Sequence, residues 1–255
     1  LAKARSRITW ALIGLAVVIG ASSGIGEGIA RAIAEQKPKG LVLAARRENL
    51  LGKLASSIND TYQVNPLVVR TDITSPKDIK NLFERTINKY NRLDLLVNSA
   101  GVVQSEKSID DTSVEEIISI IQTNLTGTML AAHYVMPIFK RQKYGVMVNI
   151  SSGAGKNAYA GEAPYCGSKA GVDHFVRALD EDLKVLRKKG FEIYTFAIGP
   201  GFIDTQEARR KFPNVGEDIW KKVPSVIEFG RLVTGYLLDP KKSYKNGPVV
   251  HIDTW

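Results

Sequence analysis

Short apolar runs recur along the chain, separated by stretches in which apolar and polar positions alternate at helical spacing. Apolar runs bounded by turn residues predict strands that are buried on both faces of a parallel sheet. Strands are predicted at 15–19, 41–45, 65–70, 93–97, 145–150, 192–197 and 249–252. Helices are predicted at 27–36, 76–90 (with Ser75 as its N-cap), 114–124, 128–140, 165–189 and 226–238. This alternation predicts one α/β domain over 1–255, with a doubly wound, mostly parallel Rossmann-type sheet and helices on both faces.

The first apolar run ends in a glycine-rich turn, Gly20-Ala-Ser-Ser-Gly24-Ile-Gly26, and a helical stretch follows it. Glycine is needed where the backbone takes a positive φ and where it closely approaches a pyrophosphate. The helix amino terminus then offers free N–H groups to that phosphate. A dinucleotide-binding turn is therefore predicted, with cofactor contacts from Gly20, Ser22, Ser23, Gly24, Ile25 and Gly26.

The residues after the second predicted strand bear on the choice of cofactor. Sheets that bind NAD carry an acidic residue about 20 residues after the glycines, where it holds the ribose 2′-hydroxyl. This chain has Arg46 and Arg47 there instead, and guanidinium groups bind a phosphate. The pair favours NADP(H) over NAD(H). The alternative is two solvated arginines at the start of a helix.

Tyr165-Cys-Gly-Ser-Lys169 opens a predicted helix shortly after the strand that ends before Ser152. Residues four apart share one helix face, so Tyr165 and Lys169 point the same way. A nearby ammonium lowers the pKa of a tyrosine, and Ser152 can hydrogen-bond the oxygen that receives the proton. The trio predicts proton transfer to or from a carbonyl or an alcohol. Taken alone, however, a Tyr-x-x-x-Lys spacing is more often a half-buried aromatic beside a solvated lysine.

Together these motifs resemble the short-chain dehydrogenase/reductase family, in its single-domain branch, from about residue 15 to 252. The resemblance is carried by Gly20-x-x-x-Gly24-x-Gly26, Asn98-Ser-Ala-Gly101, Asn124, Ser152, Tyr165-x-x-x-Lys169 and Pro200-Gly201, in the family's order. It implies a seven-stranded sheet of order 3-2-1-4-5-6-7, with the cofactor across the carboxyl ends of the strands.

The resemblance also implies the roles of the site residues. Tyr165 is expected to be the general acid and Ser152 to polarise the carbonyl. Lys169 is expected to hold the nicotinamide ribose and lower the pKa of the tyrosine, and Asn124 to fix a water that relays protons. The remaining expected cofactor contacts are Asp72 and Ile73 beside the adenine, Asn98, Ala100 and Gly101 along the groove, and Pro200, Gly201, Ile203 and Thr205 near the nicotinamide. No metal is expected, because His133, His174 and His251 fit no ligand spacing and are expected at a surface or interface.

These features predict an NADPH-dependent carbonyl reductase acting on a ketone, a diketone or an oxoacyl thioester. One alternative is an NAD-dependent alcohol or hydroxysteroid dehydrogenase that runs in the oxidative direction. The other is a cofactor-sensing or nucleic-acid-binding protein on the same fold. The net charge of +9 invites the last alternative, but the basic residues are scattered, so no specific nucleic-acid partner is expected.

Residues 202–224 form a predicted substrate loop, a polar stretch with three isolated aromatic residues, Phe202, Phe212 and Trp220. They could form a lid over an apolar substrate or simply pack. Arg209, Arg210 and Lys211 could engage an acidic substrate or carrier protein, but we expect them to form a solvated helical face. The helices at 114–140 and 165–189 are expected, by the resemblance, to pair subunits in a homodimer or homotetramer.

The amino-terminal residues and the cysteine bear on the compartment. The single cysteine, Cys166, excludes an intrachain disulfide. An apolar run at 8–19 is shorter than the roughly 20 residues of a spanning helix, and its last third is needed as a strand. We expect residues 1–14 to be an extra segment of a cytoplasmic protein, with peripheral membrane attachment through 1–19 left open.

Overall fold

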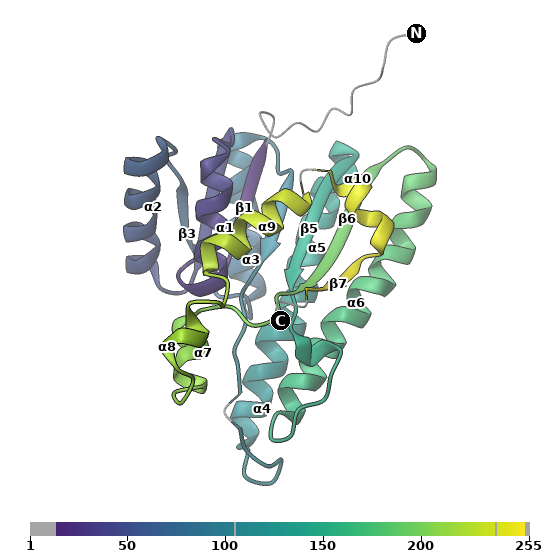
Figure 1. The fold of residues 1–255 in the computed structure, drawn as a ribbon. Helices are drawn as coiled ribbons and strands as arrows, with labels where there is room; N and C mark the ends of the chain where they lie inside the picture. The colour runs from purple at the N-terminus through teal and green to yellow at the C-terminus, as the bar shows by residue number, and fades with distance from the viewer. Residues whose placement is uncertain (1–13, 105, 238, 253–255) are drawn as a thin grey trace.

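The computed structural model describes residues 14–104, 106–237 and 239–252. Its centre is a seven-stranded sheet of order β3-β2-β1-β4-β5-β6-β7, in which every neighbouring pair runs parallel (Figure 1). The strands are β1 (Leu15–Ile19), β2 (Gly40–Ala45), β3 (Leu67–Arg70), β4 (Leu95–Asn98), β5 (Tyr144–Ile150), β6 (Glu192–Gly199) and β7 (Val249–His251). The predicted fold class and strand order are confirmed.

The helices follow the strands in the expected alternation. They are α1 (Gly24–Glu35), α2 (Glu48–Tyr62), α3 (Pro76–Tyr90), α4 (Val114–Ile121), α5 (Gly127–Gln142), α6 (Ala163–Lys188), α7 (Gln206–Lys211), α8 (Glu217–Trp220), α9 (Val226–Leu237) and α10 (Pro240–Ser243). Short 3₁₀ turns lie at Gly153–Gly155 and Tyr244–Asn246. Ser75 caps α3 by accepting a hydrogen bond of 3.2 Å from the backbone N–H of Asp78, as predicted.

The short helices α7, α8 and α10 were not predicted, and two other helical features also differ from the prediction. A π-helical turn, Gln122–Thr126, joins α4 to α5, so the two helices predicted there form one continuous rod. Helix α2 was not among the predicted helices. It buries only Leu51, Leu54 and Ile58 along one stripe, and its remaining positions are mostly polar.

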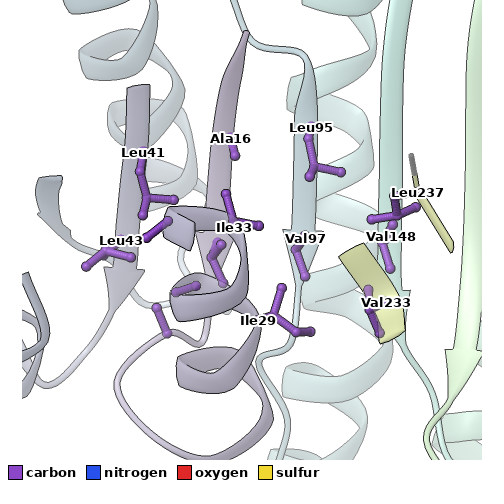
Figure 2. Close-up of a cluster of buried hydrophobic side chains, with 14 of the residues drawn as sticks. Ala16, Ile29, Ile33, Leu41, Leu43, Leu95, Val97, Val148, Val233 and Leu237 are labelled. Atoms are coloured by element: carbon purple, nitrogen blue, oxygen red, sulfur yellow. The ribbon is translucent and has the colours of Figure 1, made fainter. Parts of the chain in front are cut away.

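The side chains of β1 alternate between two hydrophobic layers. Ala16 and Val18 pack with α1, α2 and α9 on one face, and Val17 and Ile19 pack with α3, α5 and α6 on the other. Figure 2 shows the first layer, with Ile29 of α1 beside the strands. Because β1 pairs with β2 on one side and β4 on the other, its carboxyl end lies inside the row of strand ends that forms the site.

Two glycines allow α1 and α9 to cross in backbone contact. A Cβ on Gly28 would lie 2.0 Å from the carbonyl oxygen of Val226, and one on Gly230 would lie 2.4 Å from that of Gly28. Either side chain would force the helices apart. Helix α9 therefore holds the end of the 202–224 segment against the glycine-rich turn.

Nothing in the described ranges is both long enough and apolar enough, as a helix, to cross a membrane. The expected amino-terminal segment, apart from residue 14, lies outside the described residues. The same is true of residues 105, 238 and 253–255, including the last position of the helix predicted at 226–238.

Candidate active site

A cleft of about 790 Å³ runs along the carboxyl ends of the parallel strands. Most of the predicted site residues line it: Gly20, Ser22, Ser23, Gly24, Ile25, Arg46, Arg47, Asp72, Ile73, Ala100, Gly101, Ser152, Tyr165, Lys169, Pro200, Gly201, Ile203 and Thr205. Three predicted residues do not: Gly26, Asn98 and Asn124. These three residues lie behind the residues that line the cleft and support them.

The turn after β1 needs its glycines for close packing. Gly20 has a φ of +82°, and a Cβ there would lie 2.6 Å from the backbone nitrogen of Ala100. A Cβ on Gly26 would lie 2.2 Å from the carbonyl oxygen of Gly20, so Gly26 packs α1 against the turn instead of facing the cleft. Ser23 stands at the N-cap of α1 without bonding that helix through its side chain. The first amides of α1 are therefore left for an anion, which fits a dinucleotide pyrophosphate.

Arg47 bridges from the start of α2 to the glycine-rich turn. Its Nη2 donates to Ser22 Oγ at 3.0 Å and to Ser23 Oγ at 2.6 Å. Arg46 is exposed beside it, and its charge acts on Asp72. Two cations and two hydroxyls therefore gather at one end of the cleft, a set that fits a phosphate.

Asp72 remains a carboxylate at the end of β3. Burial works to raise its pKa, but hydrogen bonds to Oδ1 from the backbone N–H of Thr74 at 2.9 Å and from its hydroxyl at 2.8 Å bring the pKa below its ordinary value. The next residue, Ile73, packs against Gly127 of α5. A Cβ on Gly127 would lie 2.9 Å from Ile73 Cγ1.

Asn98 and Asn124 support the loop after β4 from behind. Asn98 donates to Thr128 Oγ1 at 2.9 Å and accepts from the backbone N–H of Ala100 at 3.2 Å. Asn124, in the π-helical turn, accepts from the N–H of Val102 at 2.8 Å and donates to Ser168 Oγ at 3.0 Å. These bonds fix the loop on which Ala100 and Gly101 face the cleft.

Ser152, Tyr165 and Lys169 are brought together at the other end of the cleft. Ser152 follows β5, and its hydroxyl lies close enough to the Tyr165 phenol on α6 to act on the pKa of that phenol. Lys169 Nζ lies 5.8 Å from the centre of the Tyr165 ring and donates to the carbonyl oxygen of Ile150 at 3.0 Å. A phenol, a hydroxyl and an ammonium thus face the same space.

The electrostatics of this trio differ from the expectation. Burial raises the pKa of Tyr165 to about 12, although the Ser152 hydroxyl works in the other direction. Burial also lowers the pKa of Lys169 to about 8. The expectation that Lys169 lowers the pKa of Tyr165 is wrong here, because desolvation dominates and the ammonium is directed to Ile150. Tyr165 is therefore a neutral phenol that can donate a proton at neutral pH.

The family model for short-chain dehydrogenases matches residues 14–216 of this chain. The chain belongs to the short-chain dehydrogenase/reductase family. An NADP-dependent 3-hydroxy acid dehydrogenase of Schizosaccharomyces pombe is 30% identical over 190 residues, which cover 74% of this chain and 71% of that protein. An uncharacterized oxidoreductase of Staphylococcus saprophyticus is 35% identical over 191 residues, 75% of this chain and 79% of the relative.

Solved structures extend the likeness to nearly the whole chain. A variant of the actinorhodin polyketide ketoreductase with NADPH superimposes with a TM-score of 0.83 at 25% identity, covering 94% of this chain and 96% of that one. A short-chain dehydrogenase/reductase from Mycobacterium marinum gives 0.81 at 26% identity, with 94% of each chain covered. As a member of this family the chain is an oxidoreductase that acts on CH–OH groups with a nicotinamide cofactor and a small-molecule substrate.

The aromatic residues of the 202–224 segment are not isolated from one another. Phe202 stacks on Trp220 with ring centres 5.0 Å apart and meets Phe212 edge-on at 5.3 Å. Trp220 is buried, while Phe202 and Phe212 line the cleft. In this short-chain dehydrogenase/reductase the three rings thus pack together and present two apolar surfaces to the site.

The basic residues of α7 do more than form the solvated face that was expected. Arg209 pairs with Asp204 at 2.7 Å and with Glu217 at 2.6 Å, and its guanidinium lies 4.9 Å from the centre of the Trp220 ring. Lys211 pairs with Glu162, the residue that precedes α6. No sequence pattern predicts this second pair, because its members lie far apart in the chain and belong to no shared motif. Arg210 alone of the three matches the expectation in being exposed, and it lines the cleft.

Proposed function

We propose that the protein is an NADPH-dependent carbonyl reductase that transfers a hydride to a ketone, a diketone or an oxoacyl thioester. The observation that carries this proposal is the meeting of Ser152, Tyr165 and Lys169 at one end of a cleft whose other end holds Arg46 and Arg47. One end suits a reacting carbonyl, and the other suits a phosphate.

In the proposed reaction the bound nicotinamide supplies the hydride, and the protein positions the carbonyl and supplies the proton. Ser152 hydrogen-bonds the carbonyl oxygen and polarises it. Tyr165, kept neutral by burial, donates its phenolic proton to that oxygen as the carbonyl is reduced to an alcohol. Lys169 would hold the nicotinamide ribose and stabilise the resulting phenolate, while Asn124 supports a water through which the proton is replaced.

The preference for NADPH is proposed from the adenosine end of the cleft. Arg47 already crosses to Ser22 and Ser23, and Arg46 lies next to it in an exposed position. A 2′-phosphate there would receive two guanidinium groups and meet no carboxylate on the end of β2. The names of the fission yeast relative and of the ketoreductase structure, which mention NADP and NADPH, support the same choice.

The substrate class is proposed from the residues that line the cleft near Tyr165. Phe202 and Phe212 offer apolar surface there, and Arg210 and Lys211 of α7 line the same cleft. An oxo group on an otherwise apolar or acidic molecule fits these surroundings. The relatives' names, a 3-hydroxy acid dehydrogenase and a polyketide ketoreductase, point in the same direction.

We also propose that two or four copies associate through the rod of α4 and α5. Val114 and Ile118 of α4 are 65% and 47% exposed, and Met129 of α5 is 40% exposed. Exposed apolar side chains on helices already expected to pair subunits support a homodimer or homotetramer.

The direct test measures the oxidation of NADPH by the purified protein with a panel of oxo acids, diketones, oxoacyl thioesters and steroid ketones. NADH serves as the second cofactor, and NAD with the matching alcohols tests the oxidative alternative. We expect turnover with NADPH and at least one carbonyl. Tight NADPH binding without turnover on any member of the panel would instead support a cofactor-sensing protein.

A further inference from the structure

An acid–imidazole pair, whose acid is buried, lies beneath the catalytic stretch. Asp173 stands one helical turn after Lys169 on α6 and is 1% exposed. Its Oδ2 lies 2.8 Å from Nε2 of His251, which is on β7. The pair joins the catalytic helix to the last strand, and the His251 side chain is 14% exposed.

Two glycines make room for this pair. A Cβ on Gly155 would lie 2.6 Å from Asp173 Oδ2 and 3.1 Å from the carbonyl oxygen of Lys169. A Cβ on Gly199 would lie 2.3 Å from His251 Nδ1. Gly155 closes the turn that begins after Ser152, and Gly199 ends β6 just before the cleft residue Pro200. The carboxylate and the imidazole thus contact both segments that flank the reacting end of the cleft.

Two buried polar atoms of this pair, Asp173 Oδ1 and His251 Nδ1, are left without a hydrogen-bond partner within the described part of the chain. In a region that water does not reach, a charge with few partners acts strongly on its neighbours. Among the described residues, Asp173 of the same helix acts electrostatically on Lys169, and the centre of the Tyr165 ring lies 5.8 Å from Lys169 Nζ. From β5 the carbonyl of Ile150 accepts a hydrogen bond from Nζ, and the Asn124 side chain of the π-helical turn lies across Gly101 from it. Burial lowers the pKa of Lys169, and Asp173 opposes that shift.

We infer that Asp173 and His251 are positioning residues for the proposed reaction. His251 holds the Asp173 carboxylate between the turn after Ser152 and the Lys169 turn of α6, where the carboxylate keeps Lys169 protonated. The kinetic part of this inference rests on the proposed function, whereas its electrostatic part can be measured without turnover.

The test follows the titration of Lys169 by NMR in the full chain, with lysine labelled at the ε-carbon and the signal assigned by its loss in Lys169→Arg. Asp173→Asn is compared with Asp180→Asn, a matched control. Asp180 is equally buried on the same helix, at 1% exposed, and is paired with Arg187. We expect the Lys169 midpoint to fall by about one pH unit in Asp173→Asn and to stay in place in Asp180→Asn. Equal midpoints in the wild type and both variants would overturn the inference.

His251 variants provide a second, independent measurement should Asp173→Asn fail to fold. His251→Leu removes the donor, and His251→Gln retains one. We expect His251→Leu to shift the Lys169 midpoint, because the Asp173 carboxylate is no longer held in place, and to reduce kcat about 10-fold with little change in the Kd for NADPH. His251→Gln should recover part of both effects, and identical behaviour of the two variants would overturn the inference. A wild type without turnover whose Lys169 midpoint still depends on Asp173 would support the pair and contradict the proposed function.

Discussion

Lys211 of α7 forms an ion pair with Glu162, the residue immediately before the catalytic helix α6. Glu162 is 8% exposed, so water screens the pair poorly, and its partner keeps a buried carboxylate compensated. The pair connects the 202–224 segment to the helix that carries Tyr165. It therefore holds that segment, with Phe202 and Phe212, over the reacting end of the cleft.

Lys211→Met is expected to raise KM for the carbonyl about 5-fold or more, with a smaller change in kcat, because the aromatic rim is no longer held in place. Steady-state kinetics at saturating NADPH measure the change. Lys221→Met, which alters an exposed lysine in the same segment, is the control. An equal KM in both variants would mean that the ion pair does not position the segment.

Arg47→Ala is expected to weaken NADPH binding by roughly 10-fold to 100-fold, since one charge-assisted contact to a phosphate is lost, while NADH binding changes little. Fluorescence titration of both cofactors measures the two dissociation constants. Arg141→Ala is the control, because that exposed arginine lies at the end of α5, just before β5 begins and away from the carboxyl ends of the strands. Arg46→Asp should have a larger effect and reverse the cofactor preference, so that NADH binds more tightly than NADPH. A parallel loss for both cofactors would argue against NADPH selectivity.

Tyr165→Phe is expected to lower kcat by roughly 100-fold to 10,000-fold, the contribution typical of a general acid, and to leave NADPH binding nearly intact. The matched control is Tyr144→Phe. Burial also raises the pKa of Tyr144 to about 12, but this tyrosine begins β5, at the far end of the strand from Ser152. If Tyr165→Phe retained activity, another group would have to supply the proton.

The pKa of Lys169 also predicts a pH-dependent stability. Its value of about 8 in the folded protein lies below the 10.5 of an ordinary lysine, so burial of the ammonium destabilises the fold. This destabilisation is fully present below about pH 8 and disappears as the pH rises toward 10.5, because the folded protein loses the proton first. Lys169→Met should therefore stabilise the protein by roughly 2–3 kcal/mol at neutral pH and by much less at the upper end of that window, while turnover is lost.

Urea denaturation of the wild type and Lys169→Met at several pH values measures this difference. Lys184→Met is the control, since that lysine is exposed on the same helix and pairs only with Glu181 at the surface. A stability difference that does not change with pH would show that the effect of Lys169→Met comes from packing instead of charge.

Two glycines of α9 should respond in opposite ways to alanine. Gly230→Ala brings a Cβ within 2.4 Å of the backbone of α1 and should destabilise the fold by about 1–3 kcal/mol. Gly235, on the same helix, has nothing within 4 Å of such a Cβ, so Gly235→Ala should stabilise it by about 0.5–1 kcal/mol. Thermal unfolding of both variants provides the comparison. Similar melting temperatures would mean that α1 and α9 can move apart without loss of stability.

The sequence was sufficient for the features that are encoded locally. Continuous apolar runs identified the strands, and glycine spacing identified the turn after β1, because both depend on neighbouring residues. The contacts of Glu162 with Lys211 and of Asp173 with His251 join distant parts of the chain, and no spacing rule brings them together. The direction of the Tyr165 pKa was missed for a related reason. Whether desolvation or a neighbouring charge prevails depends on burial, and burial is known only once the chain is folded.

The π-helical turn between α4 and α5 has a consequence for how this chain tolerates changes in length. A π-helical turn accommodates one more residue than an α-helical turn, and Asn124 lies within it. Deleting Thr123 or Leu125, the two neighbours of Asn124, would tighten this turn to a regular α-helical one and change the direction in which the Asn124 side chain points. Asn124 would then lose its hydrogen bonds with Val102 and Ser168, although Asn124 itself is unchanged. A one-residue deletion in this turn should therefore be as harmful as replacement of the asparagine itself.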